Sequence, residues 1–165
     1  NKNQAEKVVQ RVGGTIIRIN YPIRLTNANK LDYIHSPLKK FKENALHPLF
    51  NDQQVGITYI DEFAQAVIAI ISSSKSGIFH ISSSNVGSPY DIITYTLSHL
   101  GQDISSIQKS SIVDYLSLQK NKYRYPIKGG LSCQKTEKEL GIKLKTWEQT
   151  IDELITDGLN LASLS

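Results

Sequence analysis

The chain has 165 residues, of which 39% are apolar, and this is enough for one domain with a modest hydrophobic core. Its net charge of +4 comes mainly from lysines scattered over residues 30–45 and 120–145, and because no aromatic residues are interleaved with them in a stacking pattern, we expect a solvated surface and no nucleic-acid partner. No apolar run approaches the ~18 residues that a membrane-spanning helix needs, and no signal peptide is recognisable, so we expect no membrane partner.

The first predicted elements are a helix and a strand. Residues 2–12 have apolar side chains at helical spacing and polar side chains elsewhere, which predicts an amphipathic helix that ends at residues 13–14, both Gly. Its apolar stripe consists of Ala5, Val8, Val9 and Val12. Thr15–Ile19 is a β-branched run without alternation, which is typical of a parallel strand covered on both faces. A helix followed by such a strand is half of a β-α-β unit.

Residues 20–82 alternate between loops, helices and strands. A polar loop over residues 20–30 precedes a predicted helix over residues 31–44, whose pattern is interrupted by Pro37. Residues 55–60 are predicted to be extended, and we expect Asp61 to cap the next helix rather than to act as a catalytic acid. The apolar stripe of that helix consists of Phe63, Val67, Ile70 and Ile71. A second strand with almost continuous apolar character follows over residues 77–82.

The second half of the chain is predicted to be mainly helical. The sequence Ser-Pro-Tyr-Asp at residues 88–91 is typical of a helix start, and this helix is expected to run to Leu100 and stop at Gly101. The last helix begins at a second capping box, formed by Thr146 and Gln149, and buries Trp147, Ile151, Leu154 and Ile155. Between these helices we predict a strand near residue 107, helices over residues 112–118 and 133–140, and a loop over residues 123–126, with Gly141 closing the second helix.

The Cys and His residues lack the spacing of a metal site. Because Cys133 is the single cysteine, it excludes an internal disulfide, and we expect a packed, neutral thiol in a reducing, cytoplasmic compartment. We expect His80, in a buried strand, to be a hydrogen-bonded core residue, and we expect no metal at His35, His47 or His99.

The beginning of the chain is unusual for a gene product. The sequence contains no Met and starts with Asn1 inside a predicted helix. We therefore expect this chain to be one part of a longer protein.

Five segments in a fixed order resemble a known family. They are Asn-Lys-Asn-Gln-Ala-Glu at residues 1–6, Ile-Ile-Arg-Ile-Asn-Tyr-Pro at 16–22, Asn-Asp-Gln-Gln at 51–54 followed by Gly-Ile-Thr-Tyr-Ile-Asp-Glu-Phe-Ala at 56–64, Gly-Ile-Phe-His-Ile at 77–81, and residues 124–147. Together they resemble the extended short-chain dehydrogenase/reductases, and among them the dTDP-4-dehydrorhamnose reductase group. Residues 1–6 are similar to the tail of that family's Tyr-x-x-x-Lys helix. Phe79 departs from the family's usual Tyr, and Arg24 from its usual Gly.

The resemblance implies an α/β fold made of the carboxyl-terminal part of an NAD(P)-binding Rossmann-like fold and a small α/β substrate-binding lobe. Residues 1–165 would then be one truncated unit. Residues 1–30 and 55–82 would be the remnant of the Rossmann sheet, and residues 31–54 and 83–165 the substrate-binding lobe. Because the sequence contains no Gly-rich turn for the cofactor pyrophosphate, NADPH or NADH is not expected to bind this chain alone.

The resemblance also implies the residues of the site. In this chemistry a Tyr hydroxyl protonates the substrate carbonyl, while a Lys one helical turn away lowers the Tyr pKa and binds the nicotinamide ribose. Lys2 would be this catalytic and cofactor-binding Lys, and the matching Tyr would precede it by four residues, outside the sequence. The other implied cofactor residues are Tyr21, Pro22 and Ile23, and the implied substrate residues are Asn20, Tyr21, Gln53, Gln54 and Arg124. Without the resemblance, Lys2 and Arg124 would be read as surface residues, and Tyr21 equally well as a core residue.

The resemblance therefore implies an NAD(P)-dependent reductase of a nucleotide-diphosphate sugar, of which this chain would be an inactive part. Its partners would be the sugar nucleotide, the amino-terminal half and a second copy in a homodimer. Two alternatives remain open. One is a non-catalytic regulatory protein of the same fold, like the regulatory subunit of methionine adenosyltransferase. The other is a nucleotide-sugar epimerase or dehydratase.

Overall fold

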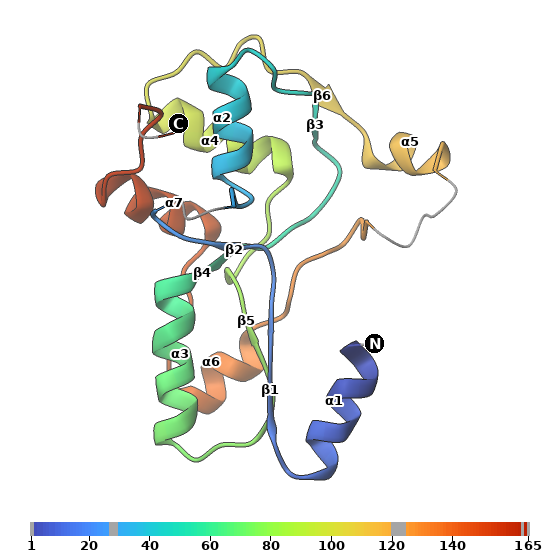
Figure 1. Ribbon diagram of the computed structural model, residues 1–165, viewed down its shortest axis with the longest axis vertical. Helices are drawn as coiled ribbons and strands as arrows, with labels where there is room; N and C mark the ends of the chain where they lie inside the picture. Colours follow the sequence, from blue (N-terminus) through green and yellow to red (C-terminus); the bar gives the residue numbers. More distant parts are fainter. Residues whose placement is uncertain (1, 27–29, 120–124, 163, 165) are drawn as a thin grey trace.

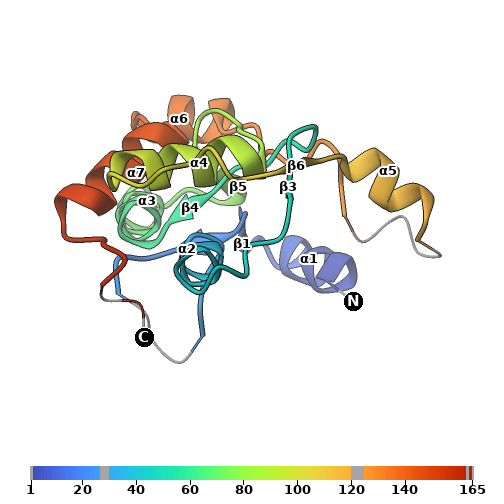
Figure 2. The same cartoon turned by 90° about the horizontal axis from the view of Figure 1, so that it is seen from above.

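Short parallel strands and helices make up an α/β fold in the computed structural model, which describes residues 2–26, 30–119, 125–162 and 164 (Figure 1). Strands β1 (Thr15–Ile19) and β5 (Gly77–Ile81) pair in parallel, from Thr15 opposite Gly77 to Ile19 opposite Ile81. Helices α3 (Ile60–Ser72) and α6 (Gln134–Leu140) lie on one face of this pair, and α1 (Lys2–Arg11) lies on the other (Figures 1 and 2). The predicted parallel arrangement of the two longest strands is therefore confirmed.

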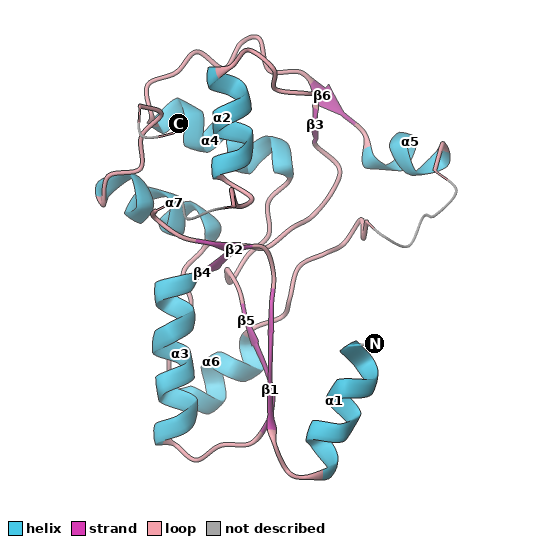
Figure 3. Cartoon of the chain, viewed as in Figure 1, coloured by secondary structure: helices cyan, strands magenta, loops and turns pink. Residues whose placement is uncertain are grey.

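A helical layer lies beyond the carboxyl ends of β1 and β5. It contains α2 (His35–Lys42), α4 (Pro89–His99) and α7 (Trp147–Thr156), next to the short parallel pair β2 (Pro22–Ile23) and β4 (Thr58–Tyr59) (Figure 3). Fifteen buried residues from these elements and the flanking segments form one hydrophobic cluster. A smaller cluster lies between β5, α3 and α6. The chain thus buries apolar surface in two separate places.

A third parallel pair leads into a projecting arm. Strand β3 (Leu49–Phe50) pairs with β6 (Lys109–Ser110), and helix α5 (Ile112–Ser117) follows β6 away from the rest of the molecule (Figure 1). The predicted helix over residues 112–118 is confirmed within one residue, whereas the strand predicted near residue 107 lies slightly later in the chain. Helix α5 buries Ile112 and Leu116, whereas Val113 and Leu118 are exposed.

Strand β1 is less covered than its sequence predicts. Among the residues that the structure describes, it is hydrogen-bonded only to β5, so its second edge has no neighbouring strand. Ile16 is buried, but Arg18 is exposed and Ile19 is 38% exposed. Helices lie on both faces of the β1–β5 pair, but the burial that was predicted for β1 is wrong at its outer end, where no described strand covers the second edge.

The apolar stripe of α1 also lacks a partner within the described part of the chain. The helix has no buried residue, and its Val8 and Val12 are 60% and 79% exposed. Its end was predicted correctly: Gly13 has a φ of +69°, and the amide of Gly14 donates to the carbonyl of Val9. The stripe and the free edge of β1 belong to elements that pack against each other.

Other helix boundaries show which local signals are reliable. The capping boxes of α4 (Ser88 with Asp91) and α7 (Thr146 with Gln149) are both present, and Gly141 ends α6 with a φ of +66°. Two predictions in this part of the sequence were wrong. Helix α3 begins at Ile60, so Asp61 lies in its first turn and is not the cap. Ile71, which was predicted to be buried, is 71% exposed.

Helix α2 begins later than predicted because the side chain of Asp32 binds backbone amides at its start. The Asp32 carboxylate accepts the backbone N–H groups of Ile34 and His35 and contacts the His35 ring at 2.8 Å. These bonds satisfy free amides at the helix start, so α2 begins at His35. Pro37 therefore lies in the first turn, where proline is tolerated, and does not interrupt the helix.

In the ranges described, none of the helices has both the length and the apolar character that crossing a membrane would require.

We predict that Asp32→Ala destabilises the fold. Burial alone would raise the pKa of Asp32, but hydrogen bonds from His35 and Ile34 lower it below the ordinary value. A lowered pKa in the folded state means that this contribution is present above about pH 4 and is lost as the pH falls through the folded value. At pH 7 the substitution should lower the free energy of unfolding by roughly 2–4 kcal/mol. It should also make the free energy of unfolding depend less on pH in the acid range.

Urea unfolding between pH 2.5 and pH 7 measures both effects. Asp103→Asn is the control, because Asp103 is an exposed carboxylate that caps only the nearby Ser105. The control should leave the urea midpoint nearly unchanged. Equal acid limbs for wild type and Asp32→Ala would show that Asp32 does not carry the predicted contribution.

Candidate functional site

A strained turn lies directly after β1. Tyr21 has a φ of +34°, which is uncommon for a residue with a side chain and is found most often at functional sites. The turn is held from both sides: the amide of Asn20 donates to Thr58 Oγ1 at 3.1 Å, and the amide of Thr58 donates to the Tyr21 carbonyl at 3.3 Å. The side-chain amide of Asn20 donates to the carbonyl of Gly129. Neighbouring segments therefore determine where the Tyr21 ring lies.

The Tyr21 ring lines the main pocket, a cavity of about 420 Å³ between the strand ends and the helical layer. The ring of Tyr33 lies 4.3 Å from it, tilted by 35°, and burial raises the pKa of both hydroxyls. Phe50 and Tyr125 contribute two further rings to the lining. A pocket of this size with several aromatic side chains is suited to a planar organic ring.

Gln53 joins this pocket to the segment that follows residue 125. The side chain is only 5% exposed, and its amide nitrogen donates to the carbonyl of Pro126 at 2.9 Å. The backbone of the next residue, Gln54, bonds to Ile127 and Gly129. Segments more than seventy residues apart in the sequence are therefore joined at the pocket.

Asp52 is a structural residue of the site that sequence reasoning missed. Its carboxylate accepts the hydroxyl of Ser111 at 2.6 Å and the amide of Ile112 at 2.7 Å, so it caps the start of α5. Burial would raise the pKa of Asp52, but these hydrogen bonds lower it. The helix in turn places Tyr115 with its ring centre 5.5 Å from that of Phe50 and 5.9 Å from that of Tyr125. No local pattern in the sequence connects residue 52 with residue 111.

The wall of the pocket around Tyr33 rests on a buried contact. Asp32 lines this wall, and its carboxylate lies 2.8 Å from one ring nitrogen of His35 at the start of α2. The other ring nitrogen of His35 lies 3.2 Å from the carbonyl oxygen of Leu25. Asp32 also accepts the amide of Arg24 at 3.2 Å. The loop after β2 is thus fixed to the helix that supports Tyr33. Of the four histidines, His35 is therefore the one with a clear structural role here.

The helix that carries Lys2 is held by a different set of contacts. Arg18 on β1 donates to both carboxylate oxygens of Glu6 on α1, at 2.9 and 2.6 Å, and the Glu6 interaction raises the pKa of Arg18. The third guanidinium nitrogen, Nη1, lies 3.4 Å from Nε2 of His80, whose other ring nitrogen lies 3.1 Å from the carbonyl oxygen of Ser132. His80 is hydrogen-bonded as predicted, but it is half-buried rather than in the core.

The structure places the remaining predicted residues in different surroundings. Lys2 is exposed at the start of α1, and Pro22 is exposed in β2. Ile23 is fully buried in the larger hydrophobic cluster, and the side chain of Gln54 is exposed. Arg124 lies outside the described residues. The cofactor and substrate contacts of all these residues stay predictions, and Tyr21 and Gln53 are the two that share the main pocket.

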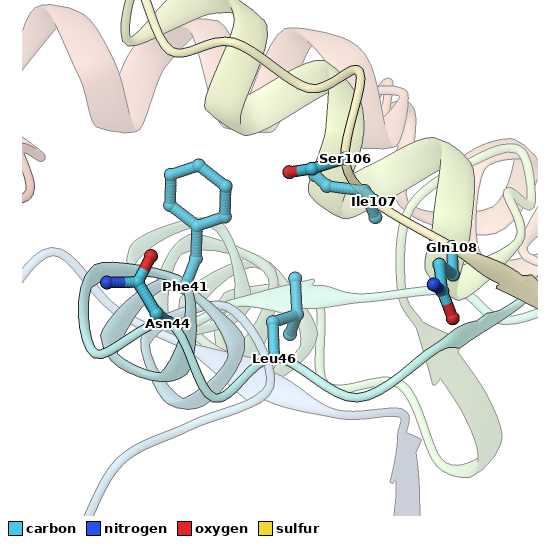
Figure 4. Close-up of a pocket in the computed structure, with 6 residues that line it drawn as sticks. All are labelled: Phe41, Asn44, Leu46, Ser106, Ile107 and Gln108. Carbon is cyan, nitrogen blue, oxygen red and sulfur yellow. The ribbon is translucent and has the colours of Figure 1, made fainter.

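A second, smaller depression lies between the end of α2 and the loop before β6. Its volume is about 180 Å³, and its lining, drawn in Figure 4, consists of Phe41, Asn44, Leu46, Ser106, Ile107 and Gln108. It lacks the stacked rings of the main pocket. Within the described ranges, no group of three or more His, Cys, Asp or Glu residues is placed to hold a metal ion.

Comparison with protein families identifies relatives of the whole chain. The model of the RmlD substrate binding domain matches residues 1–160. Among curated protein sequences, none matches this chain.

Solved structures share the fold. The dTDP-4-dehydrorhamnose reductase of Bacillus anthracis, solved in complex with NADP, superposes with a TM-score of 0.75 at 13% identity, over 94% of this chain and 53% of the reductase. The enzyme of the same name from Yersinia enterocolitica gives 0.71 at 17% identity, over 97% and 54%. The WbmG enzyme of Bordetella bronchiseptica, solved with NAD and UDP, gives 0.65 at 15%, over 90% and 45%. This chain spans about half the length of these proteins.

We predict that the pair of Glu6 and Arg18 holds α1 against β1. Because α1 buries no side chain, removing the pair by Glu6→Gln should increase the amide hydrogen-exchange rate of residues 6–11 several-fold without changing that of β5. The exchanged pair, Glu6→Arg with Arg18→Glu, should restore most of the protection. Lys7→Gln, which removes an exposed charge from the same helix, is the control. If the Glu6→Gln protein keeps wild-type exchange rates in α1, the pair does not hold the helix.

Proposed function

The chain belongs to the RmlD substrate-binding domain family, and from this premise we propose that it is the sugar-nucleotide-binding part of an NAD(P)-dependent nucleotide-sugar reductase. In this proposal β1 and β5 are the last strands of a Rossmann-like sheet, and the helical layer is the substrate-binding lobe. The observation that carries the proposal is the strained Tyr21, placed at the carboxyl end of β1 against an aromatic pocket. Open α/β sheets bind their ligands at this end of the strands.

The described residues fit only one end of a dinucleotide cofactor. An NAD(P) cofactor supplies or accepts the hydride in this class of reaction. Lys2 at the start of α1 would hold the nicotinamide ribose, and Tyr21 with Pro22 would lie next to the ring. Within the described ranges there is no Gly-rich turn at a helix start to receive the pyrophosphate. We therefore propose that an amino-terminal nucleotide-binding half supplies that site and the catalytic Tyr.

The amino-terminal half would pack against the uncovered surface of β1 and α1. Within the described residues, no strand pairs with the second edge of β1, and the Val8 and Val12 side chains of the neighbouring helix α1 are exposed. A parallel strand added to β1 would satisfy its backbone groups, and an apolar element would cover the stripe. This arrangement supports a further part of the same fold, which a non-catalytic regulatory protein would also have. A Tyr four residues before Lys2 and a Gly-rich turn in that part would favour the enzyme.

Epimerases and dehydratases of the same fold are the second candidate. The dTDP-glucose 4,6-dehydratase of Bacillus anthracis superposes with a TM-score of 0.67 at 13% identity, and the Helicobacter pylori ADP-L-glycero-D-manno-heptose-6-epimerase with 0.65 at 15%. Identities this low reflect the shared fold alone. The family match to the substrate-binding domain of the reductases favours reduction.

We predict that this chain binds sugar nucleotides and shows no measurable affinity for NADPH. Saturation-transfer NMR with dTDP-glucose, UDP-glucose and NADPH measures this directly. Tyr21→Ala should weaken sugar-nucleotide binding roughly ten-fold, since loss of one stacked aromatic ring costs about 1–3 kcal/mol. Tyr95→Ala, which removes a ring that stacks on His99, is the matched control and should bind like wild type.

Two outcomes would contradict the proposal. Tight NADPH binding by this chain alone would show that the cofactor site does not need an amino-terminal half. Equal loss of binding in Tyr21→Ala and Tyr95→Ala would show that the pocket containing Tyr21 is not the sugar-nucleotide site.

A further inference from the structure

The side-chain amide of Gln53 has a fixed orientation in the main pocket. Its nitrogen lies 2.9 Å from the Pro126 carbonyl oxygen, and a carbonyl oxygen can only accept a hydrogen bond. The nitrogen must therefore face Pro126, and the amide oxygen must point the other way. The side chain is 95% buried, so this orientation is determined by its packing.

The amide oxygen of Gln53 is an acceptor available to a ligand. No described residue donates a hydrogen bond to it, yet no described side-chain nitrogen or oxygen is both fully buried and without a partner. The oxygen is therefore accessible, and because Gln53 lines the main pocket, that access is from the pocket. A nearly buried acceptor without a partner is costly unless a water or a ligand donates to it.

The remaining lining limits what that ligand can be. Tyr21, Tyr33, Phe50 and Tyr125 present aromatic surface, and Asp32, Ser36 and His47 are further polar residues of the lining. No Lys or Arg appears among the described residues that line the cavity, so the lining suits a stacked ring better than a diphosphate, which would require cations. A planar heteroaromatic ring satisfies the lining, and it needs only one N–H on the edge that faces Gln53.

We propose that Gln53 determines base specificity by accepting the ring N–H of uracil or thymine. This inference rests on the proposed function, because it assigns the base of the sugar nucleotide to the main pocket. Cytosine has a lone pair at the same ring position, so two acceptors would face each other and binding would be weakened. The Asp52 cap of α5 and the hydrogen bond to Pro126 fix the position of the Gln53 amide oxygen relative to the surrounding aromatic rings.

The test compares UDP, CDP and N3-methyl-UDP in titrations of the full chain followed by NMR. UDP should bind roughly ten-fold more tightly than either analogue, the effect expected when one hydrogen bond is lost and its buried acceptor is left unpaired. Changing the ligand leaves the protein fold untouched. Gln53→Leu should bind UDP and N3-methyl-UDP equally. Gln102→Leu is the matched control, because Gln102 also donates its amide to a backbone carbonyl but lies outside the pocket, and it should keep the ten-fold preference.

The outcomes separate this inference from the proposed function. If wild type binds UDP and N3-methyl-UDP equally, the role of Gln53 is overturned while sugar-nucleotide binding stands. A preference for CDP or for a purine nucleotide also overturns it. If none of these nucleotides binds, nor UDP-glucose or dTDP-glucose, both the inference and the proposed function are overturned.

Discussion

The parallel pairing of β1 with β5 along only one edge is the constraint on which the rest of the structure depends. In the described part of the chain, β5 is the single strand that β1 bonds to, so the register from Thr15 to Ile19 sets where β1 ends and where Tyr21 turns. The same pairing leaves the second edge of β1 open beside the uncovered stripe of α1. One interaction thus positions the pocket and also defines the surface at which we propose that a nucleotide-binding half packs.

The pocket itself depends on contacts between segments that are distant in sequence. Asp52 fixes α5, Gln53 bonds to Pro126, and Asn20 bonds to Gly129. These polar contacts surround the aromatic rings of the pocket. Because these contacts join segments that are distant in the sequence, the arrangement around Tyr21 should be rigid before any ligand arrives. A rigid pocket would discriminate between bases through a single well-placed acceptor.

Local signals in the sequence predicted the elements well where the determinant lies within a few residues. The capping boxes at Ser88 and Thr146 and the glycines after α1 and α6 belong to this class. The predicted start of α2 was wrong because the Asp32 side chain accepts the backbone amides of Ile34 and His35. The predicted capping role of Asp61 was wrong because α3 begins one residue earlier. The burial of β1 was wrong because an apolar sequence does not reveal whether neighbouring strands are present.

Tyr21 and Gln53 follow recognisable motifs in the sequence, and the structure brings both to the main pocket. Their roles in binding stay predictions. Tyr33, Tyr125 and Asp52 were missed because their roles arise from contacts across the fold. The roles of Lys2, Gln54 and Arg124 stay predictions, since they depend on ligands or on residues beyond those described.

The most direct test of the account is the pattern of amide hydrogen exchange along Thr15–Ile19, measured residue by residue by NMR. In a parallel pair, a strand bonds to one neighbour through alternate residues, so a strand with one open edge should alternate between protected and fast-exchanging amides. We predict this alternation. Uniform protection of all five amides would mean that a second strand already covers β1, and it would contradict the open edge from which the two-part enzyme is inferred.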